Sequence, residues 1–210
     1  MPALGLDVTD FGVSTSATAA QNLANFKKAV DACPVGTILD VPPAASPYLI
    51  DTSGGLSTAI EINERITIRL RGDLKANFSA IQDNPPFILN FAAEGSGIIG
   101  PGRVIGDGMI NDLSVATATA ERNPGLIRLG ANYTFCHRVT FVSAPKTALL
   151  LYSAFFCDVS HNRFTGGVTF YHSTADESQT AYFGVYAAGG RRHNISDNWF
   201  YPDSGGGAVI

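Results

Sequence analysis

The residues best suited to acid–base chemistry lie close together towards the end of this 210-residue chain. Carboxylates and imidazoles can exchange protons near neutral pH, and arginine and tyrosine side chains can stabilise developing negative charge. These groups are His172, Asp176, Glu177 and Tyr182 in the stretch 171–183, and Arg191, Arg192 and His193 in the turn that follows. The candidates predicted to be catalytic are His172, Asp176, Glu177 and Arg191.

The two adjacent carboxylates, Asp176 and Glu177, cannot form an acid–base pair by themselves. On an extended segment, neighbouring side chains point in opposite directions. A partner carboxylate would come from Asp158, from Asp197 or from a neighbouring chain. A solvated charged loop without function accounts for the same residues, so both interpretations stay open.

Composition limits the class of protein that must position these groups. Charged residues make up 15% of the chain, apolar residues 45%, and there are 22 glycines and 11 prolines, which favours a β-rich fold with many turns. The net charge of -4 does not indicate nucleic acid or an anionic membrane as a partner. No apolar run reaches the roughly 20 residues of a membrane span, and the N-terminus does not resemble a signal peptide.

Cysteines and acidic residues do not indicate a metal or a cofactor. Cys33, Cys136 and Cys157 lack metal-site spacing, and we expect them to be small buried side chains without a disulfide. The segment 107–125 is predicted to be an insertion between strands. It has three oxygen-bearing side chains near its start, but their spacing matches no calcium loop.

The first forty residues differ from the rest of the chain. The segment 7–13 is predicted to be extended, and 18–33 to be a helix with a capping box formed by Thr18 and Gln21. Its apolar residues Leu23, Phe26 and Val30 should face the core. A strand at 37–43 follows, and from residue 48 onward short strands alternate with turns.

A longer unit recurs in this strand-rich part. The segments SHNRF (160–164) and SDNWF (196–200) nearly repeat, and each lies in a unit of two short strands. The units begin at Leu126, Leu149 and Gly184, and their second strands begin at Val139, Val159 and Ile195. If 171–183 is an insertion, the period is in the twenties, which is typical of a solenoid. Asn162 and Asn198 should then stack at one corner, and Phe164 and Phe200 inside. An antiparallel sandwich is the alternative, and its pairing would not follow this period.

Several N-terminal motifs resemble the opening of pectate lyase-like right-handed β-helix proteins. They are DFG (10–12), GT (36–37), VPP (41–43), RG (71–72) and GSGIIGPGRVIGDG (95–108). The segment 14–22 departs from that pattern because it lacks acidic residues. The resemblance implies an all-β, right-handed parallel β-helix with an N-terminal capping α-helix. Residues 1–47 would form the cap segment and 48–210 the coils.

This resemblance also implies a polysaccharide partner, because an outward sheet face with its loops forms the sugar-binding groove of such folds. The alternation in LIRL places Arg128 outward, with Leu150 and Tyr186 on the same face of the next coils. An arginine and a tyrosine suit an acidic sugar, although a solvated surface would have them too. The residues predicted to bind substrate are Arg128, Tyr186, Tyr182, Arg192 and His193.

The family resemblance does not name the reaction. Among proteins of this family, the chain most resembles bacteriophage tailspike depolymerases, which would act as glycosidases or lyases. The sequence motifs of polygalacturonases do not occur in it. The segment YPDSGGGAVI (201–210) looks like the start of another coil, so we expect further chain or another chain to cover that end. Tailspikes are trimeric, so the resemblance implies a homotrimer in an extracellular or virion location. A secreted lyase or epimerase, and a non-catalytic glycan-binding β-helix, are the alternatives.

Overall fold

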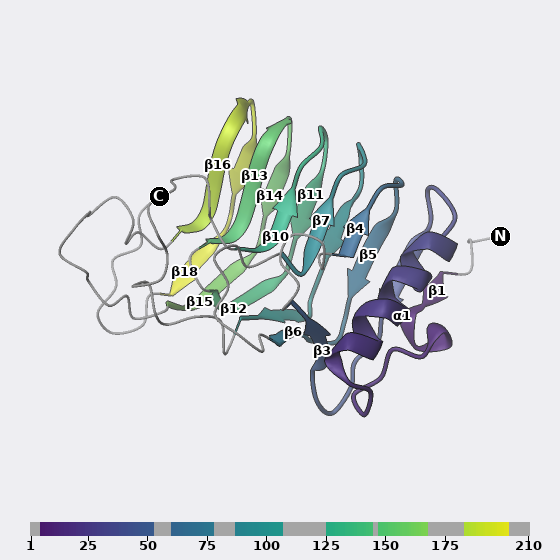
Figure 1. Cartoon of the computed structure of the whole chain (residues 1–210). Coiled ribbons are helices and arrows are strands. Elements are labelled where there is room, and N and C mark those ends of the chain that lie inside the picture. Colours follow the sequence, from purple (N-terminus) through teal and green to yellow (C-terminus); the bar gives the residue numbers. More distant parts are fainter. Residues whose placement is uncertain are drawn as a thin grey trace, which may run out of the picture.

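The computed structural model describes residues 5–52, 60–77, 87–106, 125–144, 147–167 and 183–201. These residues form three sheets of seven, six and five strands, and the strands pair in parallel throughout this part of the chain. Figure 1 shows the strands stacked side by side from the N-terminal helix towards the last coil.

The seven-stranded sheet contains β1 (Leu6–Asp7), β2 (Ile38–Val41), β5 (Thr67–Leu70), β8 (Gly97–Ile99), β11 (Phe135–His137), β14 (Asp158–Ser160) and β17 (Asn194–Ser196). The six-stranded sheet contains β3 (Tyr48–Asp51), β6 (Leu74–Asn77), β9 (Arg103–Ile105), β12 (Thr140–Ala144), β15 (Arg163–Gly167) and β18 (Trp199–Tyr201). The five-stranded sheet contains β4 (Ile60–Ile62), β7 (Leu89–Phe91), β10 (Gly125–Leu129), β13 (Thr147–Phe155) and β16 (Phe183–Arg191).

The chain visits the three sheets in the same order in every coil, as in β2, β3, β4 and then β5. This is a right-handed parallel β-helix, as predicted, and the sandwich alternative is wrong. The period varies because the connections from the six-stranded to the five-stranded sheet differ in length. They span residues 52–59, 78–88, 106–124, 145–146 and 168–182. The long insertions are therefore confined to one corner, and they include the predicted insertions 107–125 and 171–183.

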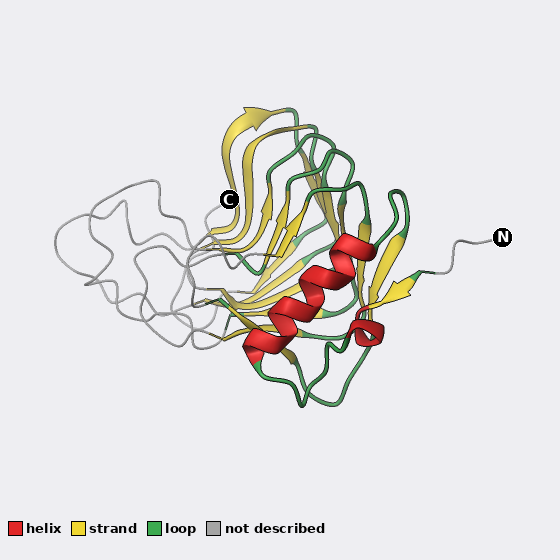
Figure 2. Cartoon of the chain, turned by 45° about the vertical axis from the view of Figure 1, so that its right-hand side comes forward, coloured by secondary structure: helices red, strands yellow, loops and turns green. Residues whose placement is uncertain are grey.

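An α-helix, α1 (Ala19–Ala32), lies across the N-terminal end of the stack, where it contacts β3 and β4 (Figure 2). Thr18 and Gln21 form the predicted capping box. Phe26 and Val30 are buried and Leu23 is half-buried against the core, so the helix covers apolar side chains that would otherwise meet water. Among the described residues, no helix is long and apolar enough to span a membrane.

The segment 7–13, predicted to be extended, is mostly a single tight turn. Only Leu6–Asp7 forms a strand, and Val8–Phe11 is a 3-10 helix, η1. The Asp7 carboxylate accepts a hydrogen bond from the backbone N–H of Thr9 at 2.8 Å, which caps the turn. Gly12, at φ 90°, ends it. The prediction of an extended segment was wrong because this local hydrogen bond favours the turn.

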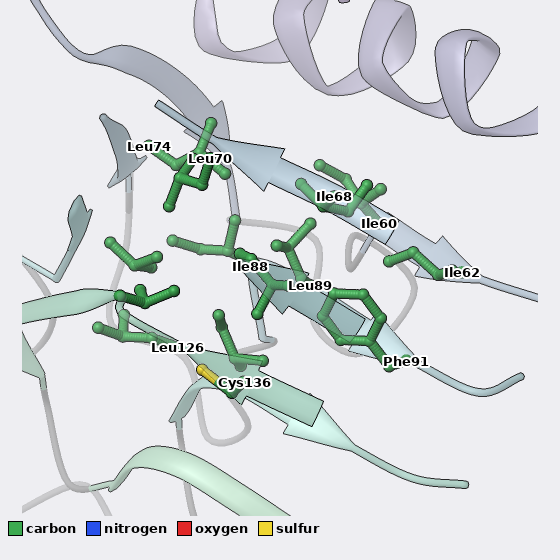
Figure 3. Packing of buried hydrophobic residues seen from close by; sticks show 14 of the residues in the cluster. Ile60, Ile62, Ile68, Leu70, Leu74, Ile88, Leu89, Phe91, Leu126 and Cys136 are labelled. Carbon is green, nitrogen blue, oxygen red and sulfur yellow. The ribbon is translucent and has the colours of Figure 1, made fainter. Parts of the chain in front are cut away.

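Like residues stack in the interior of the β-helix. In the seven-stranded sheet Leu39, Ile68, Ile98, Cys136 and Val159 follow one another in register, and all are buried. Figure 3 shows two of these side chains, Ile68 and Cys136, in the common core. The three cysteines are buried and free, as expected.

The repeated Ser-x-Asn-x-Phe segments stack as predicted. The Asn162 amide donates to Asn198 Oδ1 at 3.0 Å, and the Phe164 and Phe200 rings lie 4.8 Å apart and nearly parallel. One part of the predicted alignment is wrong, because Val159 pairs with Cys136 rather than with Val139. The reason is that Val139 lies at the corner, opposite Asn162, and its N–H donates to Asn162 Oδ1.

One ion-pair cluster lies on the outer side of the seven-stranded sheet. Asp40 is only 6% exposed and accepts hydrogen bonds from Arg69 and Arg71. Burial alone would raise the pKa of Asp40, but the hydrogen bonds and charges of the two guanidinium groups outweigh it and hold the pKa below its ordinary value. The cluster joins β2 to β5 and to the turn after it.

Candidate functional site

One outward row crosses the five-stranded sheet. Its members pair in register on successive strands and alternate with inward neighbours, nearly all of them fully buried. They are Glu61 on β4, Asn90 on β7, Arg128 on β10, Leu150 on β13 and Tyr186 on β16. The predicted alignment of Arg128 with Leu150 and Tyr186 is therefore confirmed in the backbone register. Only the backbone of Tyr186 belongs to the described structure.

Arg128 packs against an exposed aromatic ring on the next strand. Its Cζ atom lies 4.3 Å from the ring centroid of Tyr152, which is two residues beyond Leu150 and 46% exposed. A guanidinium over an aromatic face is attracted to the ring's negative quadrupole, and this contact fixes the side chain. The Arg128 Nε–H group is buried and has no acceptor among the described residues. The pair therefore combines a positive charge, a ring face and an unused donor.

Two polar residues continue this row towards the N-terminal end. The Asn90 side-chain amide donates to Glu61 Oε1 at 3.4 Å, while Asn90 Oδ1 is buried without a described donor. A Cβ atom on Gly130 would lie 3.4 Å from Asn90 Oδ1 and 3.5 Å from Arg128 Nε, so both unpaired atoms border the same glycine. Glu61 is exposed and is the carboxylate that this row supplies.

The corner between the five-stranded and seven-stranded sheets also carries aromatic and basic side chains. Tyr133 and Phe156 stack at 5.1 Å, and Arg192 Cζ lies 5.7 Å from the Phe156 ring centroid. All three residues have a left-handed backbone, with φ between 57° and 63°. Arg191 pairs with Phe155 in register at the end of β16. The predicted residues Arg191 and Arg192 thus lie at one edge of the sheet that bears Arg128.

His193 occupies a different position from these arginines. It follows Cys157 in the corner stack, and its Nδ1 atom accepts a hydrogen bond from the Cys157 backbone N–H at 3.4 Å. Partial burial lowers the pKa of His193, because it disfavours the charged imidazolium. His193 Nε2 is buried and has no described partner. The side chain is therefore part of the corner packing beside the sheet.

The remaining predicted residues lie elsewhere. His172, Asp176, Glu177 and Tyr182 lie outside the described residues. Asp158 and Asp197, suggested as partner carboxylates, are on β14 and in the turn before β18, not on the five-stranded sheet. Asp158 accepts a hydrogen bond from Asn194 at 3.0 Å, and Asp197 faces His161 at 3.9 Å. The structure does not bring these two carboxylates next to Arg128.

Sequence reasoning missed two members of the row, Glu61 and Asn90, and also Tyr152, whose ring packs against Arg128. Their signal was present, because Glu61 lies between two isoleucines and Asn90 between Leu89 and Phe91. The strands were recognised, but not which of them are neighbours in one sheet. Among the described residues no group of three His, Cys, Asp or Glu side chains is arranged to hold a metal ion.

Comparison with known proteins finds the same fold in a solved structure. No protein family profile matches the sequence, and no curated protein is similar to it in sequence. A crystal structure of a "putative glycosyl hydrolase" from Parabacteroides merdae superposes with a TM-score of 0.69 and 18% identity. The match covers 95% of this chain and 87% of that chain. At this low identity the likeness shows a shared fold.

Proposed function

We propose that this chain binds and degrades an acidic polysaccharide laid across the outward face of the five-stranded sheet. The observation that carries the proposal is the Arg128 guanidinium held 4.3 Å from the exposed Tyr152 ring. A guanidinium matches a uronate carboxylate through paired hydrogen bonds, and an aromatic ring can stack on the apolar face of a sugar. Both groups lie on a regular sheet, which holds them in place.

The rest of this face suits an extended ligand. Equivalent positions repeat at about 4.8 Å from strand to strand, and polar residues run from Glu61 through Asn90 to Arg128 along the row. The corner residues Arg191 and Arg192 add positive charge at the other end. The described groups therefore offer one carboxylate and several arginines, which favours an anionic glycan over a neutral one.

The reaction would be either glycoside hydrolysis or elimination. Hydrolysis needs two carboxylates at a defined separation, whereas elimination needs a base and a cation that stabilises the uronate during proton abstraction. In the described part of the row, Glu61 and Arg128 supply one carboxylate and one cation. A second carboxylate would come from Asp176 or Glu177, which belong, like His172 and Tyr182, to the connection between β15 and β16. These four residues keep their predicted roles.

The parallel β-helix, its shared fold with a protein described as a glycosyl hydrolase, and the N-terminal motifs support a more specific proposal. The chain would be related to pectate lyase-like proteins and would act as a tailspike-type depolymerase of bacterial surface polysaccharide. It would then work as a homotrimer, outside the cell or on a virion. Light scattering of the purified chain would show three subunits, and a monomer at all concentrations would refute the trimer.

Glycan cleavage tests this function directly. Purified protein is incubated with acidic and neutral bacterial polysaccharides, and new reducing ends are followed together with the ultraviolet absorbance of unsaturated uronates. New ends with absorbance indicate a lyase, and new ends alone indicate a hydrolase. Arg128→Gln should weaken acidic glycan binding by about 10- to 100-fold, which corresponds to a lost charge-assisted hydrogen bond. Arg138→Gln is a matched control, because Arg138 is an exposed arginine in the turn between β11 and β12.

A non-catalytic glycan-binding protein is the second candidate. It is favoured by the single carboxylate in the described row. Binding of an acidic oligosaccharide without any cleavage, and its loss in Arg128→Gln, would support this candidate and exclude degradation. Absence of both binding and cleavage across the panel would overturn the proposed function.

A further inference from the structure

A second aromatic and basic surface lies on a different sheet. The strand β18 exposes Trp199 and Tyr201, which are 58% and 48% accessible, while Phe200 between them packs against the core and stacks on Phe164. Alternate residues of a strand share one face and lie about 7 Å apart. The two rings therefore stand side by side on the outer face of the six-stranded sheet.

One arginine holds both rings. Arg163, on the neighbouring strand β15, is opposite Trp199 in register, and its Cζ atom lies 5.5 Å from the Trp199 ring centroid and 5.2 Å from that of Tyr201. A cation in contact with two aromatic faces limits the rotation of both rings. Large parts of the rings stay accessible all the same. The cluster is thus preorganised for a ligand that stacks on it.

Arg163 differs from Arg103, the other arginine in the same row, in its ion pairing. Arg103, two strands away, forms an ion pair with Asp73. Arg163 is exposed, and no described carboxylate forms an ion pair with it. A guanidinium beside two rings, without a described counter-ion, is complementary to an anionic group carried on a ring-shaped, partly apolar ligand.

From this geometry we infer that Arg163, Trp199 and Tyr201 form a second glycan-binding platform, separate from the five-stranded sheet, for an acidic oligosaccharide. The two rings would stack on sugar faces, and the Arg163 guanidinium would bind a uronate carboxylate. Because the platform involves none of the residues of the Arg128 row, it binds whether or not that row cleaves. Two binding faces on one rigid coil stack would raise the avidity for a long polysaccharide.

The chain offers a site-specific reporter for this platform. Trp199 is the single tryptophan of the protein, so its fluorescence reports on this surface alone. A short oligogalacturonate is titrated into the purified chain, with a neutral oligoglucan as the matched ligand. Tryptophan emission and its quenching by acrylamide are recorded. The acidic ligand should shift the emission to shorter wavelength and protect the ring from acrylamide, and the neutral ligand should do so at least tenfold more weakly.

Three variants separate the contributions. Arg163→Gln should weaken the emission change about tenfold or more, Arg163→Lys should restore part of it, and Tyr201→Ala should weaken it as well. Arg128→Gln should leave it unchanged, although that variant loses ligand at the other face. Circular dichroism and thermal unfolding check that each variant is folded.

Other outcomes would overturn the inference. Unchanged Trp199 emission with oligogalacturonate would do so, even if calorimetry shows binding that depends on Arg128. Emission that changes with protein concentration instead of ligand would mean that this face is an interface between copies of the chain. An unaltered response in Arg163→Gln would also refute it.

Discussion

Truncation of Asn162 should be among the most damaging single changes in the last coils. The Asn162 side chain is 1% exposed, and it joins three consecutive coils. Its Oδ1 atom accepts from Val139 N–H at 3.0 Å, and its amide donates to the Cys136 carbonyl at 2.8 Å and to Asn198 Oδ1 at 3.0 Å. Asn162→Ala leaves the buried Val139 N–H without an acceptor, and the Cys136 carbonyl keeps only its hydrogen bond within the parallel strand pair.

The size of this effect follows from one unpaired backbone N–H group and two further lost hydrogen bonds. The unpaired Val139 N–H costs about 1–3 kcal/mol and each of the other two hydrogen bonds about 0.5–1.5 kcal/mol, so the sum is roughly 2–6 kcal/mol. That is a large part of the 5–15 kcal/mol by which an average domain is stable. Equilibrium unfolding in urea, followed by circular dichroism, should show a lower midpoint for Asn162→Ala.

Asn194→Ala provides a matched control for this experiment. Asn194 also donates across coils, to Asp158 Oδ1 at 3.0 Å, but this bond is exposed to water. Water can replace a lost partner there, so the loss should stay within about 0.5 kcal/mol. Equal midpoints for the two variants would refute the argument that the buried asparagine stack holds the coils together.

Three further predictions concern stability. Two arginines hold the pKa of Asp40 below its ordinary value. The contribution of this ion pair to the free energy of unfolding is therefore complete above about pH 4, the pKa of an unfolded aspartate. It is lost as the pH falls through the lower pKa of the folded state. Asp40→Asn should therefore flatten the fall of unfolding free energy in acid, and an unchanged acid profile would contradict this. Burial raises the pKa of Cys136, so a thiol reagent should label it only as fast as the protein unfolds, and rapid labelling of the native chain would disprove its burial. A Cβ atom on Gly100 would lie 1.7 Å from the Arg138 carbonyl oxygen, whereas one on Gly130 would make ordinary contacts, so a thermal scan should show Gly100→Ala much less stable than Gly130→Ala.

The repeat with its asparagines and phenylalanines could be predicted from the sequence because stacked residues of the same type leave a visible pattern. Asn162 and Asn198 occur at the same place in two similar segments, and so do Phe164 and Phe200. The coil before them was harder to align, because Val139 occupies the corner position that asparagine holds later. A valine that hydrogen-bonds to the next coil only through its backbone gives no signal in the sequence.

The candidate site was predicted only in part, for a related physical reason. Arg128 could be assigned to the outer face from alternation within its own strand. Its neighbours Asn90 and Tyr152 become neighbours only once the register is fixed, and insertions of different length at one corner hide that register. Strand pairing over such separations is set by the packing of the whole coil stack, which local alternation does not show.

The proposed function depends most on the binding of an acidic polysaccharide by Arg128 and Tyr152. The most direct test is calorimetric titration of an acidic oligosaccharide that the wild-type chain binds, repeated with Arg128→Gln, Tyr152→Ala and the control Arg138→Gln. The Tyr152→Ala variant should lose affinity through the missing ring, and Arg128→Gln through the missing charge. We expect both variants to bind about tenfold or more weakly, while the control binds like the wild type. Wild-type affinity in both variants would contradict the claim.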